Sequence, residues 1–366
     1  MRIGIDITWL KPQISGGIES FVRNLLEGFT LLNNNDTYIL FLSKDNAKSF
    51  SSYSNLRNFT LVICNCYSHK VINRIIWQNI YFNKILMKQN IDICFTPFYC
   101  KPIKKNKQIK TITVIHDLQA LHFPEYFSFI KLKWLKYAWK KTVETSDQIV
   151  AISEFVKKDI ITQYGTKYEK KIKVIYNPIK VNCNTQPYTD FYTEPYFYTI
   201  CSAYKHKNFI TLINVMEEIV KKYPQLPQIL YVTGMKEFPI KIKDYIKSKN
   251  LENHILLTGY ISNEERDRII SGAQVFLFPS IFEGFGMPVI EALMLGTPVV
   301  TTNRTSIPEV SCNKATYVTN PMNIQEWIEL IIKILSSPYP FTKIEFPQYD
   351  IKTISNEYSN LMHQIK

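Results

Sequence analysis

Short apolar runs alternate with amphipathic helical patterns along most of the chain. In the first half, the runs with strand character cover residues 2–8, 37–43, 61–66, 91–95, 111–116, 148–153 and 173–176. Helical patterns fall between them, at residues 17–32, 71–88, 129–145 and 154–164. Because strands that alternate with helices usually pair in parallel, this order predicts an α/β fold with a mainly parallel sheet.

The alternation stops near Asn177-Pro178 and starts again at residue 196. The stretch between is rich in Asn, Thr, Pro and aromatic residues and follows neither period, which is typical of a linker. Further strands are expected at residues 196–201, 229–233, 255–257, 275–278 and 299–302, and helices at 208–222, 241–249, 263–271, 288–295 and 324–335. We therefore predict α/β domains over residues 1–180 and 196–345, joined by a linker over 181–195.

A last amphipathic helix is expected over residues 351–364, after a stretch that contains Pro338, Pro340 and Pro347. This spacing lets the C-terminal segment, residues 346–366, leave the second domain. We expect its helix to cross back to the first domain.

The charge balance is basic, with 44 Lys and Arg against 31 Asp and Glu and a net charge of +13. Basic surfaces attract nucleic acid, anionic membranes or phosphorylated small molecules, although frequent lysine alone accounts for part of the excess. The basic residues are dispersed and no nucleic-acid recognition motif is present, so nucleic acid is not expected as a partner.

The cysteines and the N-terminus indicate a cytoplasmic protein. There are seven cysteines, an odd number, and none forms a C-x-x-C pair, so we expect reduced thiols and no disulfide framework or structural zinc site. Residues 2–8 already have a strand pattern, and no signal peptide is expected. No apolar run approaches the length that spans a bilayer.

Residues 279–291 carry the densest motif, Pro-Ser-Ile-Phe-Glu-Gly-Phe-Gly-Met-Pro-Val-Ile-Glu. An apolar strand enters it, a glycine-rich turn follows, and Pro288 opens a helix that ends near Gly296. The free N–H groups and positive dipole at such a helix start bind anions. Glu283 and Glu291 lie on either side of it, and carboxylates accept hydrogen bonds from sugar hydroxyls. The motif therefore predicts an anion site flanked by two carboxylates.

Other candidate segments also follow strands. They are residues 9–17, His116-Asp117, residues 204–208 and Gly259-Tyr260. Because ligands of open parallel sheets bind beyond the carboxyl ends of strands, we expect these segments to line a binding site.

Four motifs are shared with one known family. They are Glu283-Gly-Phe-Gly-Met-Pro-Val-Ile-Glu291, Gly296-Thr-Pro-Val-Val with Ile307-Pro-Glu309, Ser15-Gly16-Gly17-Ile-Glu19, and Lys207-Asn208. By these motifs the chain resembles the retaining glycosyltransferases of the GT-B fold, family 4, whose E-x7-E motif the first one matches in full. The resemblance spans nearly the whole chain.

This resemblance implies two Rossmann-like α/β/α domains whose mainly parallel sheets face each other across a cleft. The N-terminal domain would lie on the acceptor side and the C-terminal domain on the nucleotide-sugar donor side. The implied reaction moves a mannose-, glucose- or GlcNAc-type hexose from a GDP- or UDP-sugar to a hydroxyl of a glycan or lipid-linked glycan, with the anomeric configuration kept. Such a reaction belongs to surface polysaccharide biosynthesis and is expected to need no cofactor and no metal.

In the second domain, the resemblance implies that Lys207 binds the diphosphate. The backbone N–H groups at the helix start would cradle the same group, from the residues Gly284, Phe285, Gly286 and Met287. Glu291 would hold the ribose hydroxyls, Glu283 the hexose hydroxyls, and Tyr260 lies where the family packs its nucleobase.

In the first domain, Gly16 and Gly17 would let the backbone approach the diphosphate, and His116 would approach the transferred sugar. Catalytic roles are thus expected for Glu283, His116 and Lys207. Glu283 is not assigned as a nucleophile, because a front-face displacement, in which the departing phosphate takes the acceptor's proton, also retains configuration.

One departure from the family pattern concerns charge. The family often has Arg-Lys-Asn where this chain has His206-Lys207-Asn208, and Ser202 lies near an expected glycine. Lys205 is expected to supply the missing charge, and His206 to act as a weaker cation at neutral pH.

Residues 129–141 combine apolar and basic side chains at helical spacing. With Lys101, Lys104, Lys105 and Lys107 they could rest on an anionic leaflet, which would make the protein peripheral on the inner face of the cytoplasmic membrane. The alternative is a helix whose aromatic side chains face the sheet and whose lysines face water.

Simpler interpretations of the site residues remain open at this point. Glu283 and Glu291 could be surface glutamates, Lys207 a solvated lysine, His116 a histidine satisfied at a strand end, and Gly16-Gly17 a plain turn. Among functions, the alternatives are a nucleotide-sugar epimerase or a glycan phosphorylase on the same fold, and a non-catalytic scaffold that binds sugar nucleotides. The sequence does not name the donor, the acceptor or the oligomeric state.

Overall fold

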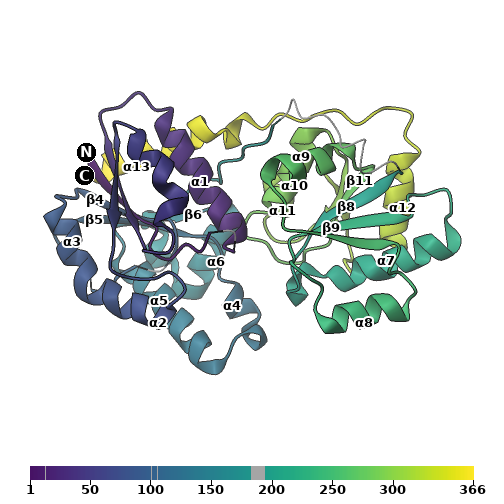
Figure 1. Cartoon of the computed structure of the whole chain (residues 1–366), viewed down its shortest axis with the longest axis horizontal. Helices are drawn as coiled ribbons and strands as arrows, with labels where there is room; N and C mark the ends of the chain where they lie inside the picture. Colours follow the sequence, from purple (N-terminus) through teal and green to yellow (C-terminus); the bar gives the residue numbers. More distant parts are fainter. Residues whose placement is uncertain (13, 100, 105, 183–193) are drawn as a thin grey trace. The chain divides into compact units, whose positions relative to one another are not determined.

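The computed structural model describes residues 1–12, 14–99, 101–104, 106–182 and 194–366. The chain forms two compact units. The first contains Met1–Pro178 and Pro347–Lys366, and the second contains Ile179–Phe346. Figure 1 colours the chain along its sequence and labels many of the helices and strands of both units.

The described part of the first unit holds a seven-stranded sheet in the order β3-β2-β1-β4-β5-β6-β7. The strands pair in parallel. Their bounds are β1 Arg2–Asp6, β2 Thr37–Leu42, β3 Phe59–Ile63, β4 Ile93–Thr96, β5 Lys110–Ile115, β6 Gln148–Ala151 and β7 Ile172–Val174. Nearly every residue of the central strands is buried, and for this reason their sequences are continuous apolar runs.

The helices of the first unit follow the expected order, except that a short helix, Gln119–His122, was not expected. They are α1 Gly16–Thr30, α2 Val71–Trp77, α3 Asn83–Lys88, α4 Gln119–His122, α5 Phe129–Thr145, α6 Glu154–Tyr164 and α13 Ile351–Ile365. The single helix expected over residues 71–88 is divided, because a π-helical segment, Gln78–Phe82, separates α2 from α3. Within this segment Gln78 and Phe82 are both buried, and Gln78 Nε2 donates to Asp6 Oδ2 over 2.5 Å. The hydrogen bond from Gln78 to β1 therefore lies where the chain changes from an α-helix to a π-helix.

The C-terminal helix α13 packs against α1 within the first unit. Ser355 Oγ donates to Leu25 O over 3.2 Å, and His363 Nε2 lies 2.9 Å from Asp36 Oδ2. A Cβ at Gly28 would collide with Ser355 Oγ and Ile351 O, so the close crossing of the two helices requires glycine there.

The described part of the second unit holds a six-stranded sheet in the order β10-β9-β8-β11-β12-β13. Its strands, also parallel, are β8 Tyr196–Ile200, β9 Ile229–Thr233, β10 Ile255–Gly259, β11 Val275–Phe278, β12 Val299–Thr302 and β13 Thr316–Val318. Its helices are α7 Phe209–Lys222, α8 Ile240–Ser248, α9 Asn263–Gly272, α10 Met287–Leu295, α11 Ile307–Val310 and α12 Ile324–Leu335. A core of α7, α8 and α12 side chains, such as Leu212, Ile246 and Trp327, covers one face of the sheet. Figure 1 shows α9 and α10 on the other face.

In both sheets the strand order reverses beside the first strand of the unit, between β1 and β4 and between β8 and β11. These are the topological switch points at which doubly wound sheets bind ligands. The two sheets confirm the prediction of two Rossmann-like α/β domains. The predicted linker, residues 181–195, lies mostly outside the described residues. In the part of the chain that the structure describes, no helix has the length and apolar character needed to cross a bilayer.

Candidate active site

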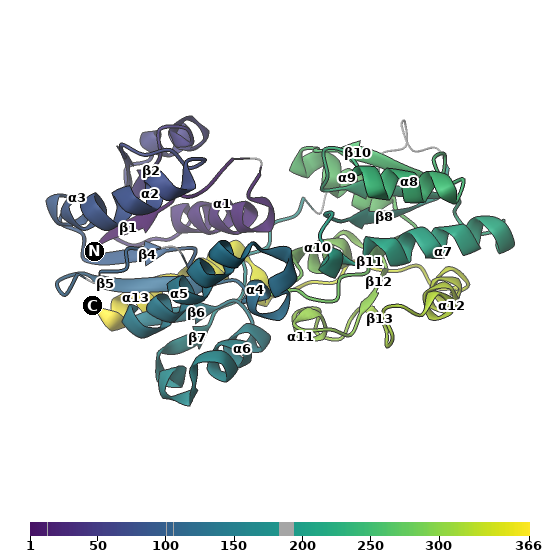
Figure 2. The same cartoon turned by 90° about the horizontal axis from the view of Figure 1, so that it is seen from below.

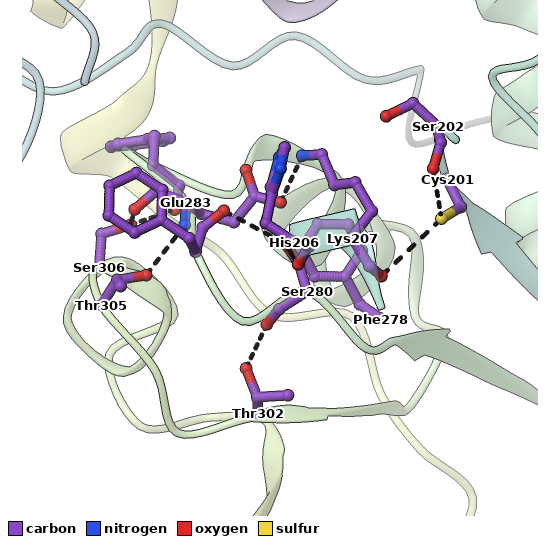
Figure 3. Close-up of polar contacts among 12 residues, drawn as sticks. Cys201, Ser202, His206, Lys207, Phe278, Ser280, Glu283, Thr302, Thr305 and Ser306 are labelled. Atoms are coloured by element: carbon purple, nitrogen blue, oxygen red, sulfur yellow. Dashed lines mark hydrogen bonds and ion pairs between the residues drawn. The ribbon is translucent and has the colours of Figure 1, made fainter. Parts of the chain in front are cut away.

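The predicted anion site lies where β11 leads into α10. Gly286 precedes the helix with φ +90°, a left-handed conformation that favours glycine. Ser306 Oγ donates to Glu283 O over 2.9 Å and to Phe285 O over 3.1 Å, and Glu283 N donates to Thr305 Oγ1 over 3.0 Å. The turn is thus held from below by the loop after β12 (Figure 3). The side chains of Phe285 and Met287 are buried, which anchors the start of α10.

Lys207 and Glu283 form an ion pair in this turn, with Nζ 2.6 Å from Oε1. Lys207 comes from the short helix Lys205–Lys207 after β8, and Glu283 from the turn after β11. The switch point of the second sheet therefore brings together two of the residues predicted for the site, although 76 positions separate them. The two side chains are only 23% and 13% exposed, so the pair is partly shielded from water.

His206 is a buried anchor rather than a cation. Its carbonyl oxygen accepts hydrogen bonds from Ile281 N over 2.8 Å and from Ser280 Oγ over 3.4 Å, which ties the β8 loop to the motif (Figure 3). Burial, followed by the charge of Lys207, lowers the pKa of His206 to about 4. The lowered pKa agrees with the expectation that His206 is a weaker cation than the family's arginine, because burial disfavours the charged imidazole. Lys205 is exposed.

Glu291 lies on α10 and is almost fully buried, with 4% of its surface exposed. Its Oε1 is 3.1 Å from Arg266 Nη1 on α9. Arg266 also donates from Nε and Nη2 to Asp267 Oδ1, over 2.9 and 2.6 Å, and Asp267 Oδ2 accepts from Asn182 N over 3.1 Å. Burial raises the pKa of the Glu291 carboxyl, and the Arg266 guanidinium opposes that rise. Among the described residues, the Glu291 carboxylate has no second hydrogen-bond partner.

Arg266 was not among the residues predicted for the site. It lies in a run of charged residues, 264–268, whose composition is typical of a solvated helix face. Its side chain is only 13% exposed, because α9 packs against α10. Nothing in the sequence directs this arginine toward Glu291.

In the first unit, His116 follows β5 and is buried. Its Nε2 is 2.9 Å from Pro97 O, and a carbonyl only accepts, so Nε2 carries the proton. Burial lowers the pKa of His116 to about 4, which leaves Nδ1 as an acceptor at neutral pH. The ring packs edge-on against Phe21 of α1, with centroids 4.9 Å apart. His116 can therefore accept a hydrogen bond from a hydroxyl group.

Gly16 and Gly17 form the first residues of α1. Gly16 has φ +53°, and a Cβ on either glycine would meet no atom within 4 Å. Ser15 does not cap the helix, since its Oγ bonds with the backbone of Lys11 instead. In the second unit, Tyr260 follows β10 and its side chain is 64% exposed. Tyr260 comes directly after β10, and Gly16 and Gly17 lie where the loop after β1 leads into α1.

The lowered pKa values of His116 and His206 predict that the folded protein loses stability in acid. The unfolded imidazole has a pKa near 6.5, so between about pH 6.5 and pH 4 the unfolded chain binds more protons than the folded one. The free energy of unfolding should therefore fall as the pH is lowered through this window, by at most about 3 kcal/mol for each histidine. Urea unfolding at a series of pH values should give a shallower pH dependence for His206→Gln than for the wild type. An equal slope in both proteins would contradict the assignment of a neutral His206.

Known proteins agree with this fold and motif. The family model described as Glycosyltransferase Family 4 matches residues 15–182, and the one described as Glycosyl transferases group 1 matches residues 186–348. The chain belongs to the GT-B glycosyltransferases of the family 4 type. The family resemblance and the fold class expected from the motifs are thereby confirmed.

Individual relatives are more distant. The chain is 27% identical over 286 residues to the O-antigen chain mannosyltransferase RfbU of Salmonella typhimurium, a match that covers 77% of each protein. Sucrose-phosphate synthase of Thermosynechococcus elongatus has the same fold, with a TM-score of 0.77 at 16% identity over 100% of this chain and 99% of that one. The Anabaena protein HepE, solved with UDP-glucose, superposes with a TM-score of 0.68 at 16% identity over 100% and 98% of the two chains.

Proposed function

We propose that this glycosyltransferase moves a hexose from a nucleoside diphosphate sugar to a hydroxyl of a growing surface polysaccharide or its lipid-linked precursor, with retention of configuration. The observation that carries the proposal is the Lys207–Glu283 pair at the start of α10. It places a cation, a helix N-terminus and a carboxylate at one switch point. A relative named as an O-antigen mannosyltransferase and a similar structure solved with UDP-glucose support the class of donor and of product.

The cation and the helix start would serve the leaving group. As the glycosidic bond breaks, negative charge grows on the diphosphate, and preorganised positive groups lower the barrier most when they face that charge. An ammonium has three donors, so Lys207 can keep its bond to Glu283 and still donate to a phosphate oxygen. The N–H groups of the first turn of α10 would add to this stabilisation.

The carboxylates would hold the sugar and the ribose. Glu283, oriented by its ion pair with Lys207, would accept hydrogen bonds from the hexose hydroxyls. Glu291, oriented by Arg266, would accept from the ribose with its second oxygen. The neutral His116 would accept a hydroxyl proton through Nδ1. In a front-face displacement the departing phosphate oxygen takes the proton of the acceptor hydroxyl, so no protein nucleophile is needed.

The test begins with donor binding. A thermal-shift screen of GDP- and UDP-hexoses, with GDP-mannose first, should show one donor that raises the melting temperature, because a ligand of the folded state stabilises it. Incubation with this donor and a lipid-linked glycan should give a product whose new linkage keeps the anomeric configuration of the donor, as read by NMR. We propose that no metal is required, so binding and turnover should both persist in EDTA.

Two outcomes would contradict the proposal. Donor binding without transfer to any glycan acceptor would favour the non-catalytic scaffold. Conversion of the nucleotide sugar in the absence of acceptor, with the hexose epimerised and still attached, would favour the epimerase.

A further inference from the structure

The positive charge of the chain is concentrated in one segment of the first unit. Residues 46–116 contain eleven lysines and arginines, and Asp92 is their only carboxylate. This segment therefore contributes +10 to the total charge of +13. It includes α2, the π-helical segment, α3 and the loop 101–109.

The solvent side of α2, the π-helical segment and α3 carries a line of exposed apolar side chains. Ile72, Ile76 and Ile80 follow one another at intervals of four residues and are 73%, 54% and 53% exposed. Val71, Tyr81 and Met87 are also exposed on these helices. The buried side is formed by other residues, Arg74, Gln78, Phe82 and Leu86. Single exposed apolar residues are normal, but a continuous line of them marks an interaction surface.

Lysines accompany this line, and carboxylates do not. Lys84 and Lys88 are exposed on α3, and residues 71–88 contain no Asp or Glu. The loop before β5 lies alongside, since Asn83 Nδ2 donates to Lys104 O over 3.0 Å and Ile103 N donates to Asn79 Oδ1 over 2.8 Å. This places the exposed Lys104 next to the apolar line.

A groove widens the apolar surface toward the edge strand β3. It has a volume of about 560 Å³ and is lined by Val62, Ile63, Trp77, Tyr81 and Ile85, with Lys84 also in its wall. Ile63 lies on the outermost strand of the sheet and is 63% exposed. The apolar line and the groove share Tyr81 and therefore form one surface, which we call the α2–α3 surface.

The start of α5 also combines exposed apolar side chains with exposed lysines. Phe129 and Ile130 are 70% and 82% exposed, and Lys131 and Lys133 beside them are exposed. The buried side of α5, with Leu135 and Trp139, packs into the unit, so the sheet-facing interpretation of this helix holds for that side. Ile75 of α2 and Trp134 of α5 line one small cavity, which shows that the two helices are neighbours. Figure 2 shows both helices in the first unit.

We propose that the α2–α3 surface, with the start of α5, docks on an anionic lipid bilayer. Isoleucine and aromatic side chains enter the boundary between headgroups and acyl chains, while lysines bind anionic headgroups at the same depth. The complementary charge selects an anionic leaflet, and the aliphatic line distinguishes this surface from one that binds nucleic acid, where phosphate contacts and base stacking dominate. Docking would hold the first unit at the membrane that carries a lipid-linked acceptor.

Vesicle flotation of the full chain tests this proposal without any need for turnover. The protein should float with vesicles of phosphatidylcholine and phosphatidylglycerol, remain unbound with phosphatidylcholine alone, and lose binding as salt is raised. Replacing Ile72, Ile76 and Ile80 together by serine should weaken binding at least about tenfold, because the inserted apolar area is lost. Lys84→Gln and Lys88→Gln should each weaken it about fivefold.

A matched control lies in the second unit. Ile240 is 76% exposed and is followed by the exposed Lys241, so Ile240→Ser/Lys241→Gln removes the same chemistry elsewhere and should leave flotation unchanged. All targeted side chains are exposed, and the variants should keep the wild-type unfolding midpoint.

Equal binding to neutral and anionic vesicles, or full binding by the triple serine variant, would overturn the proposal. Tight binding to RNA or DNA that depends on the lysines and not on the isoleucines would point to nucleic acid instead. Membrane docking rests on the proposed function, but flotation and transfer are measured independently and can fail independently. Flotation without transferase activity would refute only the function, and activity on a soluble acceptor without flotation would refute only the docking.

Discussion

The variant Glu283→Gln is expected to lower the transfer rate by about a hundredfold to a thousandfold while donor affinity changes much less. Glutamine keeps the size of the side chain but removes the charge that lies 2.6 Å from Lys207 Nζ. The hexose then loses a charged acceptor whose hydrogen bonds strengthen as the sugar becomes positive in the transition state. The effect should therefore appear in kcat more than in KM.

Steady-state kinetics with the donor found by thermal shift would measure this effect. The exposed Glu264 on α9 gives a matched control, and Glu264→Gln should keep wild-type kcat and KM. Lys207→Gln should lower kcat as well, and the double variant should be less impaired than the product of the two single effects, because the side chains contact each other. A kcat for Glu283→Gln close to that of the wild type would remove Glu283 from the catalytic residues.

The layout of both units could be predicted because each central strand is buried on two faces and so appears as an apolar run. The elements that were missed are short. The strand Thr316–Val318 has three residues and lies at the edge of its sheet, and the helix Ile307–Val310 has four. Neither is long enough to show a period. The π-helical segment was missed for another reason, since the contact of Gln78 with Asp6 joins residues 72 positions apart.

The site residues show the same limit. Glu283 and Lys207 belong to motifs that can be recognised in the local sequence of a turn and of a helix start. The two residues pair because β8 and β11, which they follow, are neighbours in the sheet. Burial at His206 and Arg266 does not follow from their neighbours in sequence, because His206 lies between two lysines and Arg266 in a charged helix. Only the packing of the β8 loop under the motif, and of α9 on α10, decides that one is neutral and the other is a buried partner of Glu291.

The variant Arg266→Met is expected to destabilise the fold by about 3 to 5 kcal/mol, because it leaves the buried Glu291 without its counter-charge. The pKa of Glu291, which burial already raises, should rise further. A protonated Glu291 is a poorer acceptor for ribose hydroxyls, so the donor KM should become larger at low pH and fall as the pH is raised through the new pKa. The same pH dependence should be weaker in the wild type.

The double variant Arg266→Met/Glu291→Gln separates the structural role from the binding role. Removing both charges should recover part of the lost stability, since Glu291 no longer leaves a buried carboxylate unpaired although Asp267 still lacks its partner Arg266, whereas donor affinity should stay low because the ribose acceptor is gone. Glu291→Gln alone should raise the donor KM about tenfold with a smaller change in kcat. Urea unfolding and donor titration on the same preparations measure the two effects independently. If the double variant regained both stability and wild-type donor affinity, Glu291 would be a structural residue, and Arg266 would serve only the packing of α9 on α10.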